Sequence, residues 1–131
     1  HHIIYMYTVL GHPEKAAKWL KVVMDSTYKV GPDGLSGNDD CGQMSAWYIW
    51  TSLGMYPMNP TSGEYVFGIP FINNATVQLP NGKKLMIQVK DTSKKRNKII
   101  AISFNGKKLP VTSISHQQIL QGGKLLITVG E

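Results

Sequence analysis

The sequence lacks several features that would assign it to a protein class at once. Its 131 residues include one cysteine, Cys41, which excludes an internal disulfide scaffold and leaves the redox compartment open. No apolar run approaches the roughly 18 residues that a membrane-spanning helix requires. No N-terminal signal pattern of basic, apolar and small residues is present, and the chain opens on His1 instead of methionine. The sequence therefore predicts no membrane span, and its length suits one ordinary domain.

Acidic residues are scarce in the second half of the chain. Residues 61–131 hold ten Lys or Arg and three acids, whereas residues 1–60 hold four Lys and five acids. The net charge of +6 is therefore concentrated after residue 60. A basic half can indicate nucleic-acid binding. Here the cations form short turn-like clusters such as Lys94-Lys95-Arg96 without interleaved aromatic residues, which favours a solvated face over a polyanion site.

The hydrophobic period changes from helical to strand-like after Pro57. Apolar residues three and four apart predict a helix from Pro13 to about Tyr28 or Lys29, and a second helix follows at about 43–53. Alternating patterns then predict strands, and two Asn-Gly pairs predict hairpin turns. The strands are expected at 65–69, 75–79, 84–89, 99–104 and 125–129, the Asn-Gly turns at 81–82 and 105–106, and one helical turn at 116–120.

This order of elements predicts an α+β chain with an antiparallel sheet. We divide it into a helical part, residues 1–57, and a β part, residues 58–131. The helix at 43–53 is apolar nearly all round, which predicts burial on several sides. Two or three short helices cannot cover one another fully, so we expect further helices from sequence outside this chain.

The loop before the second helix is the most unusual segment. Residues 33–43 (DGLSGNDDCGQ) place Asp39 and Asp40 between glycines and directly before a buried helix. Glycine permits close approach of a ligand, and a carboxylate at a helix N-terminus stays ionised. Such a carboxylate can act as a general base on water or bind a hard cation. An N-cap with a solvated acidic turn also fits the residues, whereas the spacing excludes an EF-hand.

The segment 32–48 (PDGLSGNDDCGQMSAWY) resembles the C-terminal catalytic signature of glycoside hydrolase family 92, a family of exo-α-mannosidases of which many act on α-1,2 links. The resemblance covers essentially the whole chain. It continues at 53–57 (LGMYP), 63–70 (GEYVFGIP), 105–107 (NGK), 114–116 (ISH) and 122–125 (GGKL), and residues 1–7 (HHIIYMY) are similar to the segment after the family's Asn-Glu-Pro motif.

The resemblance implies a fold and a chemistry. Residues 1–55 would be the last helices of an (α/α)6 barrel, and the strands would form a sheet or sandwich portion near the junction with a second, N-terminal β-sandwich. The chemistry implied is calcium-assisted inverting hydrolysis of a terminal mannose. The family's general-acid Glu and its calcium-binding Asn-Glu-Pro segment have no counterpart here, so the main calcium ligands are expected upstream and the metal ligands of this chain are unknown.

The resemblance also implies roles for individual residues. Asp40 matches the general base, and Asp39 matches a supporting or orienting acid beside it. Asn38 stands where some members carry a second candidate base. Because an amide cannot take a proton at neutral pH, sugar or a calcium-bound water is its expected partner. Gln43 is expected either to hydrogen-bond substrate or to cap the helix. One of His1 and His2 is expected either to line the sugar pocket or to be a core or exposed histidine, and His2 is the one assigned to the site.

These features leave three candidate functions. The leading hypothesis is the C-terminal part of a secreted or periplasmic bacterial exo-α-mannosidase that degrades mannose-rich glycans such as N-glycans or yeast mannan. The alternatives are a non-catalytic carbohydrate-binding β-module and a folded, inert structural remnant. The expected partners are a mannose-containing glycan and the remainder of the parent chain, without nucleic acid. The isolated chain is expected to lack turnover.

Overall fold

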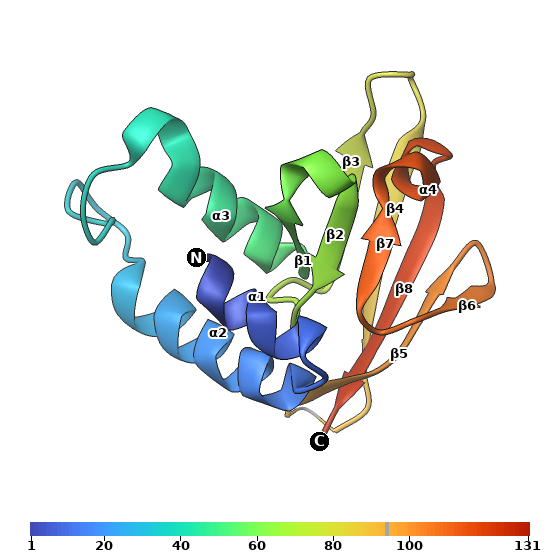
Figure 1. The fold of residues 1–131 in the computed structure, drawn as a ribbon, viewed down its shortest axis with the longest axis horizontal. Coiled ribbons are helices and arrows are strands. Elements are labelled where there is room, and N and C mark those ends of the chain that lie inside the picture. Colours follow the sequence, from blue (N-terminus) through green and yellow to red (C-terminus); the bar gives the residue numbers. More distant parts are fainter. Residues whose placement is uncertain (94) are drawn as a thin grey trace.

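The computed structural model describes residues 1–93 and 95–131, so Lys94 of the basic cluster lies outside the described residues. Three helices come first and the strands follow (Figure 1). The helices of this first part are α1 (His2–Val9), α2 (Pro13–Thr27) and α3 (Gln43–Ser52), and a 3-10 turn, η1 (Asp40–Gly42), directly precedes α3. The two helices expected from the periodicity are thus confirmed, with ends within one or two residues.

The helix α2 follows from its sequence. Pro13 occupies the first helical turn, where a missing N–H costs nothing, and Glu14 lies near the positive end of the helix dipole. Its buried residues lie on one face, where Leu20 follows Ala16 and Ala17 by four and three positions and Met24 follows Leu20 by four. One face of α2 therefore packs on the core while the rest is solvated.

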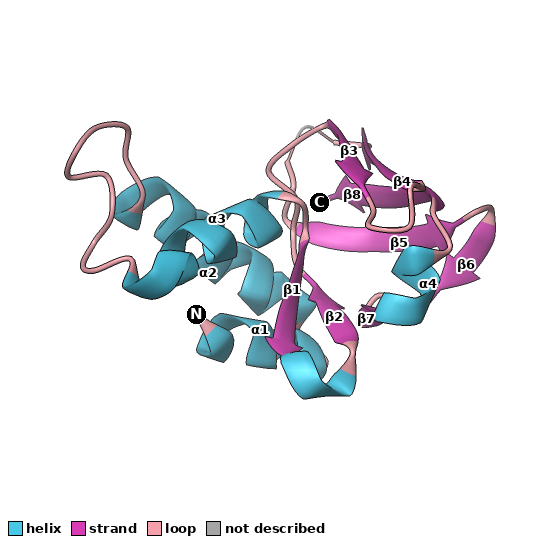
Figure 2. Ribbon diagram, turned by 90° about the horizontal axis from the view of Figure 1, so that it is seen from above, coloured by secondary structure: helices cyan, strands magenta, loops and turns pink. Residues whose placement is uncertain are grey.

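The strands form two sheets. One has three strands in the order β1-β2-β7, and the other has five in the order β3-β4-β8-β5-β6 (Figures 1 and 2). The first sheet comprises β1 (Met55–Asn59), β2 (Glu64–Phe67) and β7 (Ser113–Ser115). The second comprises β3 (Asn74–Gln78), β4 (Lys84–Asp91), β5 (Lys98–Phe104), β6 (Lys107–Leu109) and β8 (Gly123–Gly130). The short helices η2 (Pro60–Ser62) and α4 (His116–Leu120) complete the chain.

The prediction of a purely antiparallel sheet is wrong in one place. The last strand, β8, inserts between β4 and β5 and pairs with β4 in parallel over 85–91 and 123–129. Both hairpins at Asn-Gly pairs are confirmed, with Asn105 and Gly106 in the left-handed region at φ 48° and 80°. The short strands β1, β6 and β7 were not predicted. The proposed division of the chain between residues 57 and 58 stays a prediction. The strand β1 contains both of these residues.

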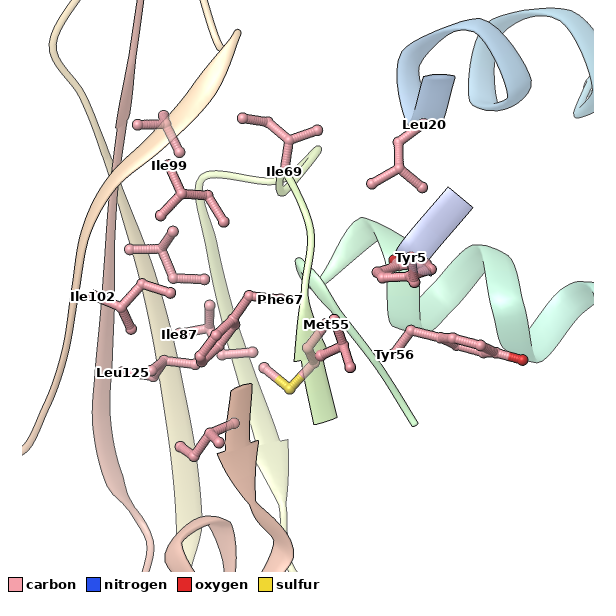
Figure 3. Close-up of a cluster of buried hydrophobic side chains, with 14 of the residues drawn as sticks. Tyr5, Leu20, Met55, Tyr56, Phe67, Ile69, Ile87, Ile99, Ile102 and Leu125 are labelled. Carbon is pink, nitrogen blue, oxygen red and sulfur yellow. The ribbon is translucent and has the colours of Figure 1, made fainter. Parts of the chain in front are cut away.

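One hydrophobic core joins the helices to both sheets. Phe67 of β2 points toward Ile87 and Leu125 of the five-stranded sheet, as Figure 3 shows. On the helical side, Tyr5 and Leu20 belong to the same buried cluster. The strands of the second part therefore hold the helices in place through direct packing.

Arg96 ties the connection between the two sheets to the loop after β4. Its guanidinium donates to the carbonyl oxygens of Pro70 at 3.3 Å and Ile72 at 3.0 Å, and it pairs with Asp91 at 3.0 Å. The predicted solvated face is therefore wrong for Arg96, whose side chain is 22% exposed. Its neighbour Lys95 does fit that prediction, because it forms an exposed ion pair with Glu131.

The apolar helix α3 is covered on one side only. Trp47 and Thr51 are buried, whereas Tyr48 is 42% and Ile49 59% exposed. The helices α1 and α2 and the strand β1 do not reach that face, so its burial by helices from outside this chain stays a prediction.

Candidate active site

The loop that carries the candidate carboxylates is closed at its base. Tyr28 and Leu35 form an isolated antiparallel bridge, and the Lys29 N–H donates to the Gly34 carbonyl at 2.8 Å. A Cβ atom at Gly34 would collide with the carbonyl oxygens of Lys29 and Gly31, so glycine is required there. The closed base holds residues 36–42 as a projecting loop at the end of the helical part (Figure 1).

Asp39 is bound to the first turn of α3. Its main-chain carbonyl accepts from the Gln43 N–H at 2.9 Å. Its carboxylate accepts from the Ser45 N–H at 2.9 Å and from the Ser45 hydroxyl at 2.7 Å, one bond to each oxygen. These hydrogen bonds from Ser45, the hydroxyl first, lower the pKa of Asp39 below its usual range because they favour the charged form.

Asp40 follows directly and has a different environment. Its side chain is exposed, and among the described residues no hydrogen bond or ion pair holds its carboxylate. The next two residues, Cys41 and Gly42, both have left-handed backbones at φ 59° and 81°. This reversal of the chain leaves Asp40 at the tip of a turn that Asp39 and Gln43 close, so its carboxylate is free to meet water or a ligand.

His1 lies against the start of α3. Its ring stacks on Trp47 with a centroid separation of 4.8 Å. The Gln43 amide donates to His1 Nδ1, and His1 Nε2 lies 3.3 Å from the Tyr28 hydroxyl, which itself donates to the Met44 carbonyl at 3.1 Å. This pattern fits a neutral imidazole that carries its proton on Nε2.

His2 lies at the same corner, by which we mean the place where the start of α1 meets the start of α3 and Tyr56 of β1. Its ring meets Tyr56 edge-on at 5.5 Å, and Tyr56 packs against Tyr5 at 5.1 Å. Burial raises the pKa of Tyr56, and a hydrogen bond with Gln43 partly offsets this rise. Gln43 therefore connects the N-terminal histidines to the turn that carries Asp40.

The structure brings together four of the five residues predicted for the site. Asp39, Asp40 and Gln43 share one turn, and α1 brings His2 to Tyr56 next to them. Asn38 is exposed on the projecting loop, and within residues 1–93 and 95–131 its side chain has no hydrogen-bond partner. The functional roles predicted for these residues stay predictions.

Sequence reasoning missed three further residues of this corner, together with the packing of His1. Ser45 had only a weak signal, since a carboxylate that precedes a helix can accept a hydrogen bond from a main-chain N–H of its first turn. Tyr28, Tyr56 and the stacked position of His1 had none, because their contacts join segments distant in sequence.

A depression of about 410 Å³ lies beside the loop, between Tyr28, Leu35, Tyr48 and Ile49. It is mainly apolar, and neither Asp39 nor Asp40 lines it. Because the candidate carboxylates lie outside it, we do not assign substrate to it, although Lys29 and Ser45 are among its lining residues.

The described part of the chain contains no group of three or more His, Cys, Asp or Glu side chains that could hold a metal ion. The expectation that the main calcium ligands lie outside this chain stays a prediction. None of its helices, within the described residues, has the length and apolar character needed to cross a bilayer.

The environment of Asp39 predicts a dependence of stability on pH. A lowered folded-state pKa adds stability that is complete above the unfolded-state value of about 3.9 and is lost as the pH falls through the folded-state value. Below about pH 4, we expect the free energy of unfolding of the wild type to fall more steeply than that of Asp39→Asn. Denaturant unfolding at a series of pH values measures both slopes, and equal slopes would contradict the prediction.

Comparison with known proteins indicates a family for the whole chain. The family model described as the glycosyl hydrolase family 92 catalytic domain matches residues 1–131. An uncharacterized secreted glycosidase of Arthroderma benhamiae is 30% identical over 130 residues, which make up 97% of this chain and 17% of the relative. The chain thus spans about one sixth of the length of this curated relative.

Solved structures agree with this match. A family 92 α-mannosidase of Bacteroides thetaiotaomicron is 39% identical with a TM-score of 0.89, over 98% of this chain and 17% of that one. Its complex with mannoimidazole gives 37% identity and a TM-score of 0.90, over 100% of this chain and 18% of that one. An inverting mannosidase of the same family and species is 35% identical with a TM-score of 0.85, over 98% of this chain and 17% of that one.

These matches confirm the resemblance seen at residues 32–48, and they extend it to the folded arrangement of the helices and both sheets. Since the family model covers the whole sequence, the chain belongs to glycosyl hydrolase family 92.

Proposed function

We propose that this chain is the C-terminal part of an exo-α-mannosidase that hydrolyses terminal α-linked mannose with inversion, and that Asp40 is its general base. The observation that carries the proposal is the exposed Asp40 carboxylate at the tip of a turn anchored by Asp39. Relatives described as α-mannosidases, one of them inverting and one in complex with mannoimidazole, support the substrate class.

Inversion needs two carboxyl groups on opposite sides of the scissile bond, roughly 6.5–9.5 Å apart, with a water molecule between the sugar and the base. Asp40 would accept a proton from this water while the water oxygen bonds to the anomeric carbon. The bond to the leaving-group oxygen breaks at the same time, and that oxygen takes a proton from a carboxylic acid supplied by another part of the parent protein. Gln43 and the histidines beside it would contact the sugar.

The finer parts of the proposal rest on the family resemblance. They are an α-1,2 preference, glycans rich in mannose as substrates, calcium bound by residues outside this chain, and secretion of the parent. The last of these is supported by the relative described as a secreted glycosidase. In Asp40 the chain contributes a base to this reaction, and it does not contribute a matching acid.

The product of the parent enzyme tests this proposal directly. With α-1,2-mannobiose as substrate and NMR detection, we expect β-mannose as the first-formed anomer, because a single displacement inverts the α configuration. A calcium chelator is expected to stop the release. First formation of α-mannose would contradict inversion, and no release of mannose with or without calcium would contradict the proposed substrate.

A further inference from the structure

The bonds of Asp39 to the first turn of α3 form a closed unit around the tip of the loop. Both carboxylate oxygens accept from one residue, Ser45, at 2.9 and 2.7 Å, and the Asp39 carbonyl accepts from Gln43 at 2.9 Å. An ordinary helix cap needs only a bond from a main-chain N–H. The additional bond from the Ser45 hydroxyl fixes the second oxygen, and with it the rotation of the carboxylate.

The turn enclosed by these bonds has an unfavourable backbone. Cys41 has a side chain and yet adopts φ 59°, a conformation that L-residues rarely adopt without help from their surroundings. The turn spans only three residues, Asp40 to Gly42, between Asp39 and Gln43. The direction of the Asp40 carboxylate therefore depends on the bonds that hold both ends of this turn.

We infer that Ser45 is a positioning residue for the general base Asp40, and that it acts through Asp39, which serves as an anchor and not as a proton acceptor. This inference rests on the proposed function. Two features favour an anchor. Each oxygen of Asp39 already accepts a hydrogen bond, and the lowered pKa of Asp39 makes it a weaker base than an ordinary carboxylate.

The inference is tested in the full-length parent with three variants and one control. Ser45→Ala removes the hydroxyl, Ser45→Thr retains it, and Asp39→Asn keeps an acceptor for the Ser45 N–H. We expect Ser45→Ala to lower kcat by about 10- to 100-fold with KM nearly unchanged, because a misplaced catalytic group costs rate more than binding. Ser45→Thr should recover most of the loss. Ser36→Ala, an exposed serine of the same loop, should behave as wild type.

Two kinetic results would overturn the inference. One is a kcat for Ser45→Ala equal to that of wild type, or an equal loss in Ser45→Ala and Ser45→Thr, since a hydroxyl-dependent role requires rescue by threonine. The other concerns the acidic limb of the pH profile of kcat/KM, which reports the general base. We expect that limb to persist in Asp39→Asn, and its disappearance would make Asp39 the base.

A second readout separates this inference from the proposed function. If the wild-type parent releases no mannose, the proposed function fails, and hydrogen–deuterium exchange over residues 39–47 then decides the structural part. Faster exchange in Ser45→Ala, restored in Ser45→Thr, supports anchoring by the Ser45 hydroxyl. Exchange that is unchanged in Ser45→Ala contradicts it.

Discussion

Replacement of Asp40 by asparagine is expected to lower kcat of the parent protein for mannose release, the proposed activity, by about 100-fold or more, with little change in KM. Asparagine has nearly the same shape, but its amide cannot accept the proton of the attacking water. The turn should stay intact, because the bonds that close it belong to Asp39, Gln43 and Ser45 and not to the Asp40 side chain. Steady-state kinetics on α-1,2-mannobiose measure the effect.

The control for this variant is Asp33→Asn in the same loop, where an exposed aspartate lies away from the turn that carries Asp40. We expect it to keep wild-type turnover, since asparagine is accepted in turns as readily as aspartate. Near-normal turnover of Asp40→Asn, with an unchanged thermal midpoint, would remove Asp40 from the role of base and direct attention to Asp39.

Truncation of Phe67 to alanine is expected to produce the largest loss of stability of any single change considered for this chain. The side chain is fully buried between the two sheets, and Figure 3 shows it directed at Ile87 and Leu125. Phe→Ala in a packed core costs about 3–5 kcal/mol, from lost burial and from the cavity left behind. We expect a clearly lower thermal midpoint and a lower yield of folded protein.

Met86→Ala provides the matched control, because this side chain lies on β4 next to Ile87 and is 47% exposed. Its effect should stay below about 1 kcal/mol. A similar loss in both variants would mean that the contact between the two sheets does not stabilise the chain in the way that the packing of Phe67 indicates.

Local patterns in the sequence predicted the local structure well. The spacing of Ala16, Leu20 and Met24 identified α2, and both Asn-Gly pairs identified hairpins, because these signals depend on residues close together in the chain. The parallel pairing of β8 with β4 has no such signal. It is set by the insertion of the last strand between two earlier ones, and the buried face of a strand does not reveal the direction of its neighbour.

The candidate site divides in the same way. The acidic loop was visible from Asp39 and Asp40, and its family from the surrounding motif. The contrast between a held Asp39 and a free Asp40 depends on hydrogen bonds from Ser45 that form only in the folded chain. The packing of His1 on Trp47 was equally hidden, since α1 brings the two together from positions 46 residues apart. Arg96 was misjudged because its carbonyl partners at Pro70 and Ile72 belong to a distant connection.

Chemical rescue by azide tests the assignment of Asp40 most directly. Azide can attack the anomeric carbon without losing a proton, so it needs no general base. With an aryl α-mannoside, we expect azide to restore turnover to the parent carrying Asp40→Ala, with β-mannosyl azide as product and the aryl oxide as leaving group. If azide leaves Asp40→Ala inactive but forms mannosyl azide with Asp39→Ala, then Asp40 is not the general base.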